Sequence, residues 1–361
     1  MKGLIKKDKL SILFNQIKKD HKVISPIFKD GVIQLSHVEE IGQLPFGYKE
    51  KEGRNYYSID KEGKDFFSYS RPTTPFKRFI HPPDFVFMKI TQENNILKFE
   101  ELFIEDKIAF FDIRPCDLKA LQILDDVFLH KNPYPDPFYK KLRENLLIVA
   151  STCFSPTDVC FCSSFDIKLK PEKGFDLLIT EIERGFVVES ISKKGEEILK
   201  NIELEDIKES DYEEIEVKLK LTKERIKKNV NVQDLPQILY SKIDDKLWDE
   251  IGKRCISCTS CTQLCPTCFC FDIVEKNDLI NKTSQRVRIY DSCFSPSFAT
   301  LHKFNIRQSI GSRYRQWLLH KMAYWTDQFG DFGCVGCGRC ITWCPSSIDI
   351  TEEIKILRDG K

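Results

Sequence analysis

Two matching runs of cysteines stand in the last hundred or so residues of the chain. Each has the spacing C-x2-C-x2-C-x3-C-P, the first over residues 255–266 and the second over residues 334–345. Three soft thiolates separated by two residues each can converge on one [4Fe-4S] cluster when the backbone wraps around it. In this arrangement the fourth cysteine of each run reaches the other cluster. The spacing therefore predicts two [4Fe-4S] clusters, one held by Cys255, Cys258, Cys261 and Cys344, and the other by Cys334, Cys337, Cys340 and Cys265.

A pair of structural zinc sites is the alternative interpretation of these runs. Pairs of cysteines with C-x2-C spacing also build tetrahedral zinc sites with four thiolates. Zinc needs only four ligands per site, however, and has no use for the third cysteine and the Cys-Pro ending that both runs contain. The pattern therefore favours iron and sulfur.

Four more cysteines follow two predicted strands in the first half of the chain. Residues 107–113 and 146–151 are short apolar runs of the kind that buried parallel strands show, and Asp117 is expected to cap a helix that runs between them to about residue 129. The loops after two parallel strands emerge at the same edge of a sheet. We therefore expect a third [4Fe-4S] cluster there. Its predicted ligands are Cys116, Cys153, Cys160 and Cys162.

Two other interpretations of these four cysteines stay open. Cys116 and Cys153 would also fit as small buried apolar side chains, because cysteine is among the most buried residue types. A zinc site is the second alternative. The remaining cysteines, Cys268, Cys270 and Cys293, are expected to be structural, and no ligand role is assigned to them.

Composition narrows the class of protein. The chain has 361 residues, a formal net charge of +1, 31% charged residues and 15 cysteines. The charge gives no reason to expect binding to nucleic acid, and the sequence has no export signal and no apolar run long enough to span a membrane. We therefore expect a cytoplasmic protein whose cysteines are metal ligands in a reducing, anaerobic setting.

Motifs for substrate chemistry are missing from the sequence. There is no G-x-G-x-x-G after a strand, no G-x-x-x-x-G-K-[ST], and no metal-type or triad-type pairing among the six histidines. The expected role is electron transfer with no catalytic residue.

The predicted architecture is an α/β N-terminal domain followed by a mainly α-helical, ferredoxin-like dicluster domain. The expected boundaries are 1–195 for the α/β domain, 196–245 for a charged helical connector and 246–361 for the dicluster domain. Within the first domain we expect a helix over 3–20, hairpins over 23–35 and 175–190, and an irregular surface segment over 42–83.

A long helix is expected over 309–325, between the two cysteine runs. Its apolar side chains share one face, and its basic side chains are expected to form a solvated face. Compensation of negative cluster charge, or docking to an acidic partner, is the alternative role for these basic groups, which are Arg313, Arg315, His320 and Lys321.

Several segments together resemble a known family. They are 255–271 with its C-P-T-C-x-C ending, 286–293, 334–350, and, further upstream, 114–117 and the C-x6-C-F-C segment that starts at Cys153. In these segments the chain resembles the iron-sulfur beta subunit of cytoplasmic sulfhydrogenases and the iron-sulfur electron-transfer subunit of anaerobic sulfite reductases.

The resemblance implies a subunit that passes electrons between a flavoprotein, which handles the pyridine nucleotide through FAD, and a catalytic partner. That partner is a nickel-iron hydrogenase pair in one group and a sirohaem sulfite reductase subunit in the other, and we favour the hydrogenase. A self-contained enzyme with an open iron in one cluster, and a zinc-stabilised assembly module, are the alternatives from other classes.

Overall fold

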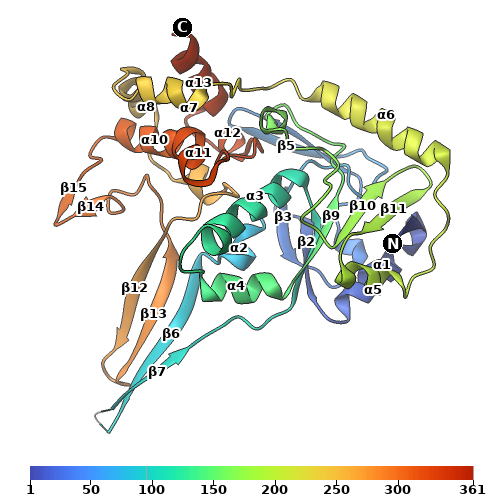
Figure 1. Ribbon diagram of the computed structural model, residues 1–361, viewed down its shortest axis with the longest axis horizontal. Coiled ribbons are helices and arrows are strands. Elements are labelled where there is room, and N and C mark those ends of the chain that lie inside the picture. The colour runs from blue at the N-terminus through green and yellow to red at the C-terminus, as the bar shows by residue number, and fades with distance from the viewer. Residues whose placement is uncertain (95, 361) are drawn as a thin grey trace.

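The computed structural model describes residues 1–94 and 96–360. Its largest element is a seven-stranded sheet with the strand order β1-β11-β10-β9-β8-β2-β3, on the right in Figure 1. Every residue of β8 and β9 is buried, as expected for strands that are covered on both faces. The strands are β1 (Lys2–Lys6), β2 (Lys22–Lys29), β3 (Val32–His37), β8 (Ile108–Ile113), β9 (Leu146–Ser151), β10 (Leu177–Glu181) and β11 (Gly185–Ser190).

Helices cover both faces of this sheet. Successive side chains of a strand point to opposite faces, so Phe110 and Phe111 enter two different cores. The core around Phe111 includes Phe14 of α1, and the core around Phe110 includes Leu121 of α3. The helices are α1 (Leu10–Lys18) and α5 (Lys193–Leu199) on one face, and α3 (Pro115–Asp125) and α4 (Pro137–Glu144) on the other.

The predicted β-α-β unit is present as β8, α3 and β9, with the two strands parallel. The prediction that Asp117 caps the helix is wrong. Arg114 occupies the N-cap position and Pro115 the first helical position, where its fixed φ favours a helix start. Asp117 instead lies inside the first turn and pairs with Arg339 from the far end of the chain. The helix continues through a π-helical turn, Asp126–His130.

Other predictions for the first half had mixed outcomes. The hairpins β2–β3 and β10–β11 are confirmed. The first helix is shorter than predicted, because residues 2–6 form a strand that pairs with β11.

The prediction of an irregular surface segment over 42–83 is wrong. This segment contains the hairpin of β4 (Tyr48–Gly53) and β5 (Tyr56–Lys61) and the short helix α2 (Lys77–Ile80). Between them the side chains of Tyr69, Arg71 and Phe76 are buried. The segment therefore packs against the rest of the protein rather than running over its surface.

Helices dominate the second half, and all of them except the one over Glu209–Arg225, which is at the upper right, lie at the upper left in Figure 1. A single apolar core joins most of the helices after residue 230 and includes Ile251, Trp317, Leu318 and Met322. The helix predicted over 309–325 is present as α10, which continues through a π-helical turn (His320–Tyr324) into α11. The helices are α6 (Glu209–Arg225), α7 (Leu235–Ser241), α8 (Leu247–Arg254), α9 (Ser260–Gln263), α10 (Ile310–Leu319), α11 (Trp325–Phe329), α12 (Arg339–Thr342) and α13 (Ile350–Asp359).

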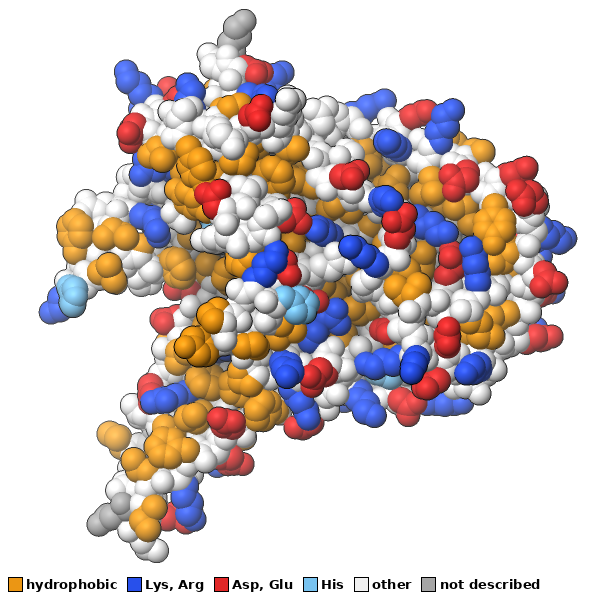
Figure 2. Space-filling model, in the orientation of Figure 1, with side chains coloured by type: hydrophobic (Ala, Val, Ile, Leu, Met, Phe, Trp, Pro, Cys, Tyr) orange, Lys and Arg blue, Asp and Glu red, His pale blue; other side chains and the backbone are white. Residues whose placement is uncertain are grey.

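A four-stranded antiparallel sheet joins the two halves and extends away from them, at the lower left in Figure 1. Its order is β12-β13-β6-β7, so that residues 84–91 of the first half pair with residues 283–289 of the second. Figure 2 shows hydrophobic side chains exposed along this arm. The segment between the cysteine runs is therefore partly β-structure, and the expectation of a mainly helical dicluster domain holds only in part. The strands are β6 (Asp84–Glu93), β7 (Ile96–Glu101), β12 (Phe271–Asp278) and β13 (Thr283–Tyr290), followed by the short pair β14 (Thr300–Leu301) and β15 (Phe304–Asn305).

Within the described residues, no helix combines the length and the apolar character needed to cross a membrane.

Candidate metal centre

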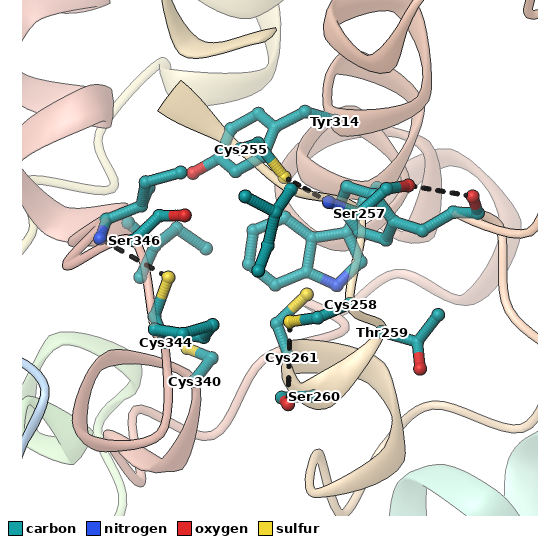
Figure 3. A pocket seen from close by; sticks show the side chains of 16 residues that line it. Cys255, Ser257, Cys258, Thr259, Ser260, Cys261, Tyr314, Cys340, Cys344 and Ser346 are labelled. Atoms are coloured by element: carbon teal, nitrogen blue, oxygen red, sulfur yellow. Dashed lines mark hydrogen bonds between the residues drawn. The ribbon is translucent and has the colours of Figure 1, made fainter. Parts of the chain in front are cut away.

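The first predicted set of cysteines surrounds one cavity. It is a small cavity of about 30 Å³ lined by Cys255, Cys258, Cys261 and Cys344. The first three lie on the loop that follows α8 and at the start of α9, and Cys344 follows α12. Figure 3 shows their side chains arranged around the cavity, with Tyr314 forming part of its wall. Cys344 of the second run thus lies beside the three cysteines of the first run, as the crossed pairing predicts.

Both cysteine runs fold into the same loop. Residues 257 and 259 of the first run have positive φ angles of 57° and 67°, and Gly336 and Gly338 at the equivalent positions have 60° and 78°. In each run the second residue after the first cysteine donates its backbone N–H to that cysteine's Sγ at 3.4 Å, from Ser257 to Cys255 and from Gly336 to Cys334. These donors stabilise a negative sulfur and leave the thiols turned inward.

The second predicted set also comes together. Burial raises the pKa of the Cys340 thiol well above its ordinary value, and the neighbouring Cys334, Cys337 and Cys265 raise it further. Cys265 receives a hydrogen bond from Lys321, whose Nζ lies 3.1 Å from its Sγ. The contacts of Lys321 place the end of the first run beside the start of the second, because its Nζ lies 3.2 Å from the carbonyl oxygen of Gly333, which precedes Cys334.

The third predicted set lines a second small cavity, of about 20 Å³. Its walls include Cys116, Cys153, Cys160 and Cys162. Cys116 lies in the first turn of α3, directly after β8, and the other three lie in the loop after β9. The carboxyl edge of two adjacent parallel strands therefore brings these cysteines together, as the β-α-β unit predicts.

A strained residue shapes the entrance to α3 beside this cavity. Asp112 adopts a φ of 64° at a register shift between β8 and β9. Its carboxylate accepts hydrogen bonds from the hydroxyl groups of Tyr69 and Ser151. Burial raises the pKa of Asp112 to about 6, although Arg114 lowers it. This bend turns the chain so that Arg114 and Cys116 both line the cavity.

The third set packs directly on the second cysteine run. The N–H of Phe161 donates to the carbonyl oxygen of Gly336 at 2.9 Å. A Cβ at Gly336 would lie 2.5 Å from the carbonyl carbon of Phe161, and one at Gly338 would lie 2.5 Å from the carbonyl oxygen of Val159. Both glycines are therefore needed for close approach as well as for positive φ. The first run has Ser257 and Thr259 at these positions, also with positive φ, and Ser257 donates its hydroxyl to the carbonyl oxygen of Phe294.

A buried ion pair fixes the same junction. Arg339 at the start of α12 donates to both carboxylate oxygens of Asp117 on α3, at 2.8 and 2.7 Å. It also donates to the carbonyl oxygen of Pro72, and the side chains of both charged partners are 1% exposed. Bidentate pairing of this kind adds geometric specificity to the contact between the two elements.

The three sets form a series. Cys337 of the second set also lines the third cavity, and Cys340 of the second set also lines the first cavity. The second set therefore lies between the other two.

The three remaining cysteines lie near the first and second sets. Cys293 is buried in the helical core, and Cys268 packs against that core. The ammonium group of Lys77 donates to the carbonyl oxygen of Cys268 at 2.7 Å. The structural role expected for these cysteines stays a prediction.

The basic side chains of residues 313–321 do not form one solvated face, so that expectation is wrong. Lys321 is 4% exposed and Arg313 is 8% exposed. A signal was available in the sequence, because Lys321 follows Trp317 by four residues and precedes Trp325 by four, which places it on the apolar face of the helix. Lys77, which is also buried, had no comparable signal in a segment expected to be irregular.

The chemistry of these donor sets fits [4Fe-4S] clusters. Two of the sets place four thiols around a cavity rather than at one point. Among residues 1–94 and 96–360, no three His, Cys, Asp or Glu side chains gather in the close geometry of a single bound metal ion. Thiol-only ligation around a space of this kind is what a [4Fe-4S] cluster requires.

Comparison with known proteins agrees with this chemistry. Residues 254–348 match the family of the 4Fe-4S dicluster domain. The chain is also similar to Sulfhydrogenase 2 subunit beta of Pyrococcus furiosus, with 29% identity over 352 residues that cover 96% of this chain and 95% of that protein. The predicted resemblance to an iron-sulfur beta subunit is confirmed. No solved structure matches the chain. The dicluster match spans all eight cysteines of the two runs, whereas the third set lies outside it.

Proposed function

We propose that the chain is the electron-transfer subunit of a multisubunit oxidoreductase and carries three [4Fe-4S] clusters in series. The observation that carries the proposal is the shared position of Cys337 and Cys340, each of which belongs to the second set and lines the cavity of a neighbouring set. Bound clusters would supply one-electron carriers. Relaying electrons requires no acid, base or nucleophile from this chain.

The protein's contribution is to hold the ligands and keep them at fixed separation. The matching loops of the two runs present backbone N–H groups to Cys255 and Cys334. The pair of Arg339 with Asp117 holds α12 against α3, and so holds the second set against the third. Rigid placement matters because electron transfer depends on the distance between carriers.

The proposed partners are a flavoprotein that exchanges electrons with a pyridine nucleotide and a catalytic subunit, within the cytoplasm. A nickel-iron hydrogenase is the favoured catalytic partner, because the similar Pyrococcus protein belongs to a sulfhydrogenase and the likeness extends over nearly the whole of both chains. The second candidate function is the electron-transfer subunit of an anaerobic sulfite reductase, because the cysteine segments of this chain resemble both families.

The test uses the complex purified without oxygen through a tag on this chain. Replacing Cys337 by Ala should remove the middle cluster and abolish pyridine-nucleotide-linked turnover. Turnover with an artificial donor that reduces the catalytic partner directly should remain. Cys270→Ala is the matched control, because this cysteine belongs to none of the three sets, and it should preserve both activities. Normal pyridine-nucleotide-linked turnover in Cys337→Ala would show that electrons do not follow this path.

A further inference from the structure

A buried ammonium group contacts the fourth cysteine of the first run. Lys321 is 4% exposed, and its Nζ lies 3.1 Å from the Sγ of Cys265, 3.0 Å from Oγ1 of Thr267 and 3.2 Å from the carbonyl oxygen of Gly333. A lysine ammonium has three protons, so these contacts use all of its donors. The group is therefore held in one position against the sulfur.

No carboxylate neutralises this charge among the described residues. The other buried cations near the middle set differ in this respect, because Arg339 pairs with Asp117 and Arg71 pairs with Glu52. Lys77 is also buried and pairs with no carboxylate among the described residues, but its Nζ contacts the carbonyl oxygens of Cys268 and Thr262 and the ring of Tyr290 rather than a ligand sulfur. A buried charge without a counter-ion is costly, so the position of Lys321 calls for a negative group at Cys265.

The two cysteine runs provide an internal comparison. Their first cysteines accept equivalent backbone hydrogen bonds, both at 3.4 Å. Their fourth cysteines differ. Cys344 accepts from the backbone N–H of Ile348 at 3.3 Å, whereas Cys265 accepts from a charged ammonium group. Cys265 also contacts Oγ1 of Thr267 at 3.1 Å, so the fourth cysteine of the first run has two polar side-chain neighbours, of which Lys321 is the charged one.

The two sites also differ in exposure. Cys258 of the first set is exposed, whereas Cys337 of the middle set is buried. A [4Fe-4S] cluster with four thiolates carries a charge of about −2 and gains one more negative charge on reduction. Burial disfavours that added charge. Without a compensating positive charge, the middle cluster would therefore be harder to reduce than the first cluster.

We propose that the ammonium group of Lys321 sets the reduction potential of the cluster held by Cys265, Cys334, Cys337 and Cys340, and offsets the cost of burying it. The inference rests on the proposed function. A fixed positive charge stabilises the reduced cluster more than the oxidised one, and a charged donor to a ligand sulfur acts in the same direction. Lys321 thereby keeps the reduction potential of the middle cluster close to the potentials of its two neighbours, so that electrons can pass through it.

The test is a redox titration of the full chain, followed by electron paramagnetic resonance, in wild type, Lys321→Gln, Lys321→Arg and Arg315→Gln. The middle cluster is identified as the component that disappears in Cys337→Ser. In Lys321→Gln we expect the equilibrium between its oxidised and reduced forms to move at least tenfold toward the oxidised form, which is about 59 mV for one electron. Lys321→Arg keeps the charge and should restore most of the potential. Arg315→Gln removes an equal charge from a partly exposed position on α10 and should leave the potential unchanged.

Iron and sulfide contents separate the two levels of the proposal. An unchanged potential in Lys321→Gln with full iron content would overturn the role of Lys321 and leave the proposed function standing. Wild-type protein without iron and sulfide would overturn the proposed function itself.

A second measurement covers the case in which Lys321→Gln fails to bind iron. Wild-type protein labelled with ¹⁵N-lysine should show a nitrogen hyperfine coupling to the reduced middle cluster, because the Lys321 Nζ contacts the Cys265 sulfur directly. The absence of that coupling would also overturn the role of Lys321.

Discussion

Replacing Arg339 by Met tests how the second and third cysteine sets are held together. The substitution removes both hydrogen bonds to Asp117 and leaves a carboxylate that is 1% exposed without its partner. Breaking a buried ion pair by removing one partner costs about 3–5 kcal/mol. For a chain of this size that loss corresponds to a fall in the unfolding midpoint of roughly 4–7 °C. The measurement is a thermal unfolding scan without oxygen, at a fixed scan rate.

Two further variants make the result decisive. Asp117→Asn combined with Arg339→Met removes the stranded charge as well, so the double variant should unfold at a higher temperature than Arg339→Met alone. Arg315→Met is the control, because that side chain is partly exposed and its single hydrogen bond is to the carbonyl oxygen of Ile243. The reasoning is refuted if Arg339→Met unfolds within about 2 °C of wild type, or if the double variant is no more stable than the single one.

Three further predictions concern the third set and its surroundings. Cys153→Ala should lower iron and sulfide by about four atoms each per chain, and an unchanged iron content would exclude the third cluster. Gly336→Ala should destabilise the protein more than Gly330→Ala does. Both glycines have positive φ, but only a Cβ at residue 336 would lie 2.5 Å from the backbone of Phe161. Equal unfolding midpoints for the two variants would contradict this. The pKa of Asp112 is raised from an ordinary 3.8 to about 6, so the folded protein binds the carboxyl proton more tightly than the unfolded chain does. The contribution of Asp112 to stability therefore falls as pH rises through 6. Asp112→Asn should remove this loss and gain roughly 1 kcal/mol on wild type between pH 5 and pH 7; parallel pH profiles of the two unfolding midpoints would count against it.

The sequence was informative where local pattern decides structure. The two cysteine runs predicted which four thiols would surround the first cavity, because ligand spacing and a following proline constrain the loop strongly. The β-α-β unit predicted that Cys116 would meet the loop after β9, because parallel strands place both loops at one edge.

The sequence was less informative where distant segments meet. Strand β6 pairs with β13, about two hundred residues away in the chain, and strand pairing of this range leaves little local signal. Asp117 looked like a helix cap, but its partner Arg339 lies in the second cysteine run. Residues 42–83 looked irregular because of their prolines, yet Pro72 and Arg71 pack beside the third set and the second run.

The central claim is that three clusters lie in series within one chain, and counting iron, acid-labile sulfide and zinc tests it most directly. The measurement uses the full chain purified without oxygen. The account predicts about twelve iron and twelve sulfide atoms per chain, with little zinc. About eight of each would mean that the cavity lined by Cys116 and Cys153 holds no cluster, and that the proposed series ends at the dicluster domain.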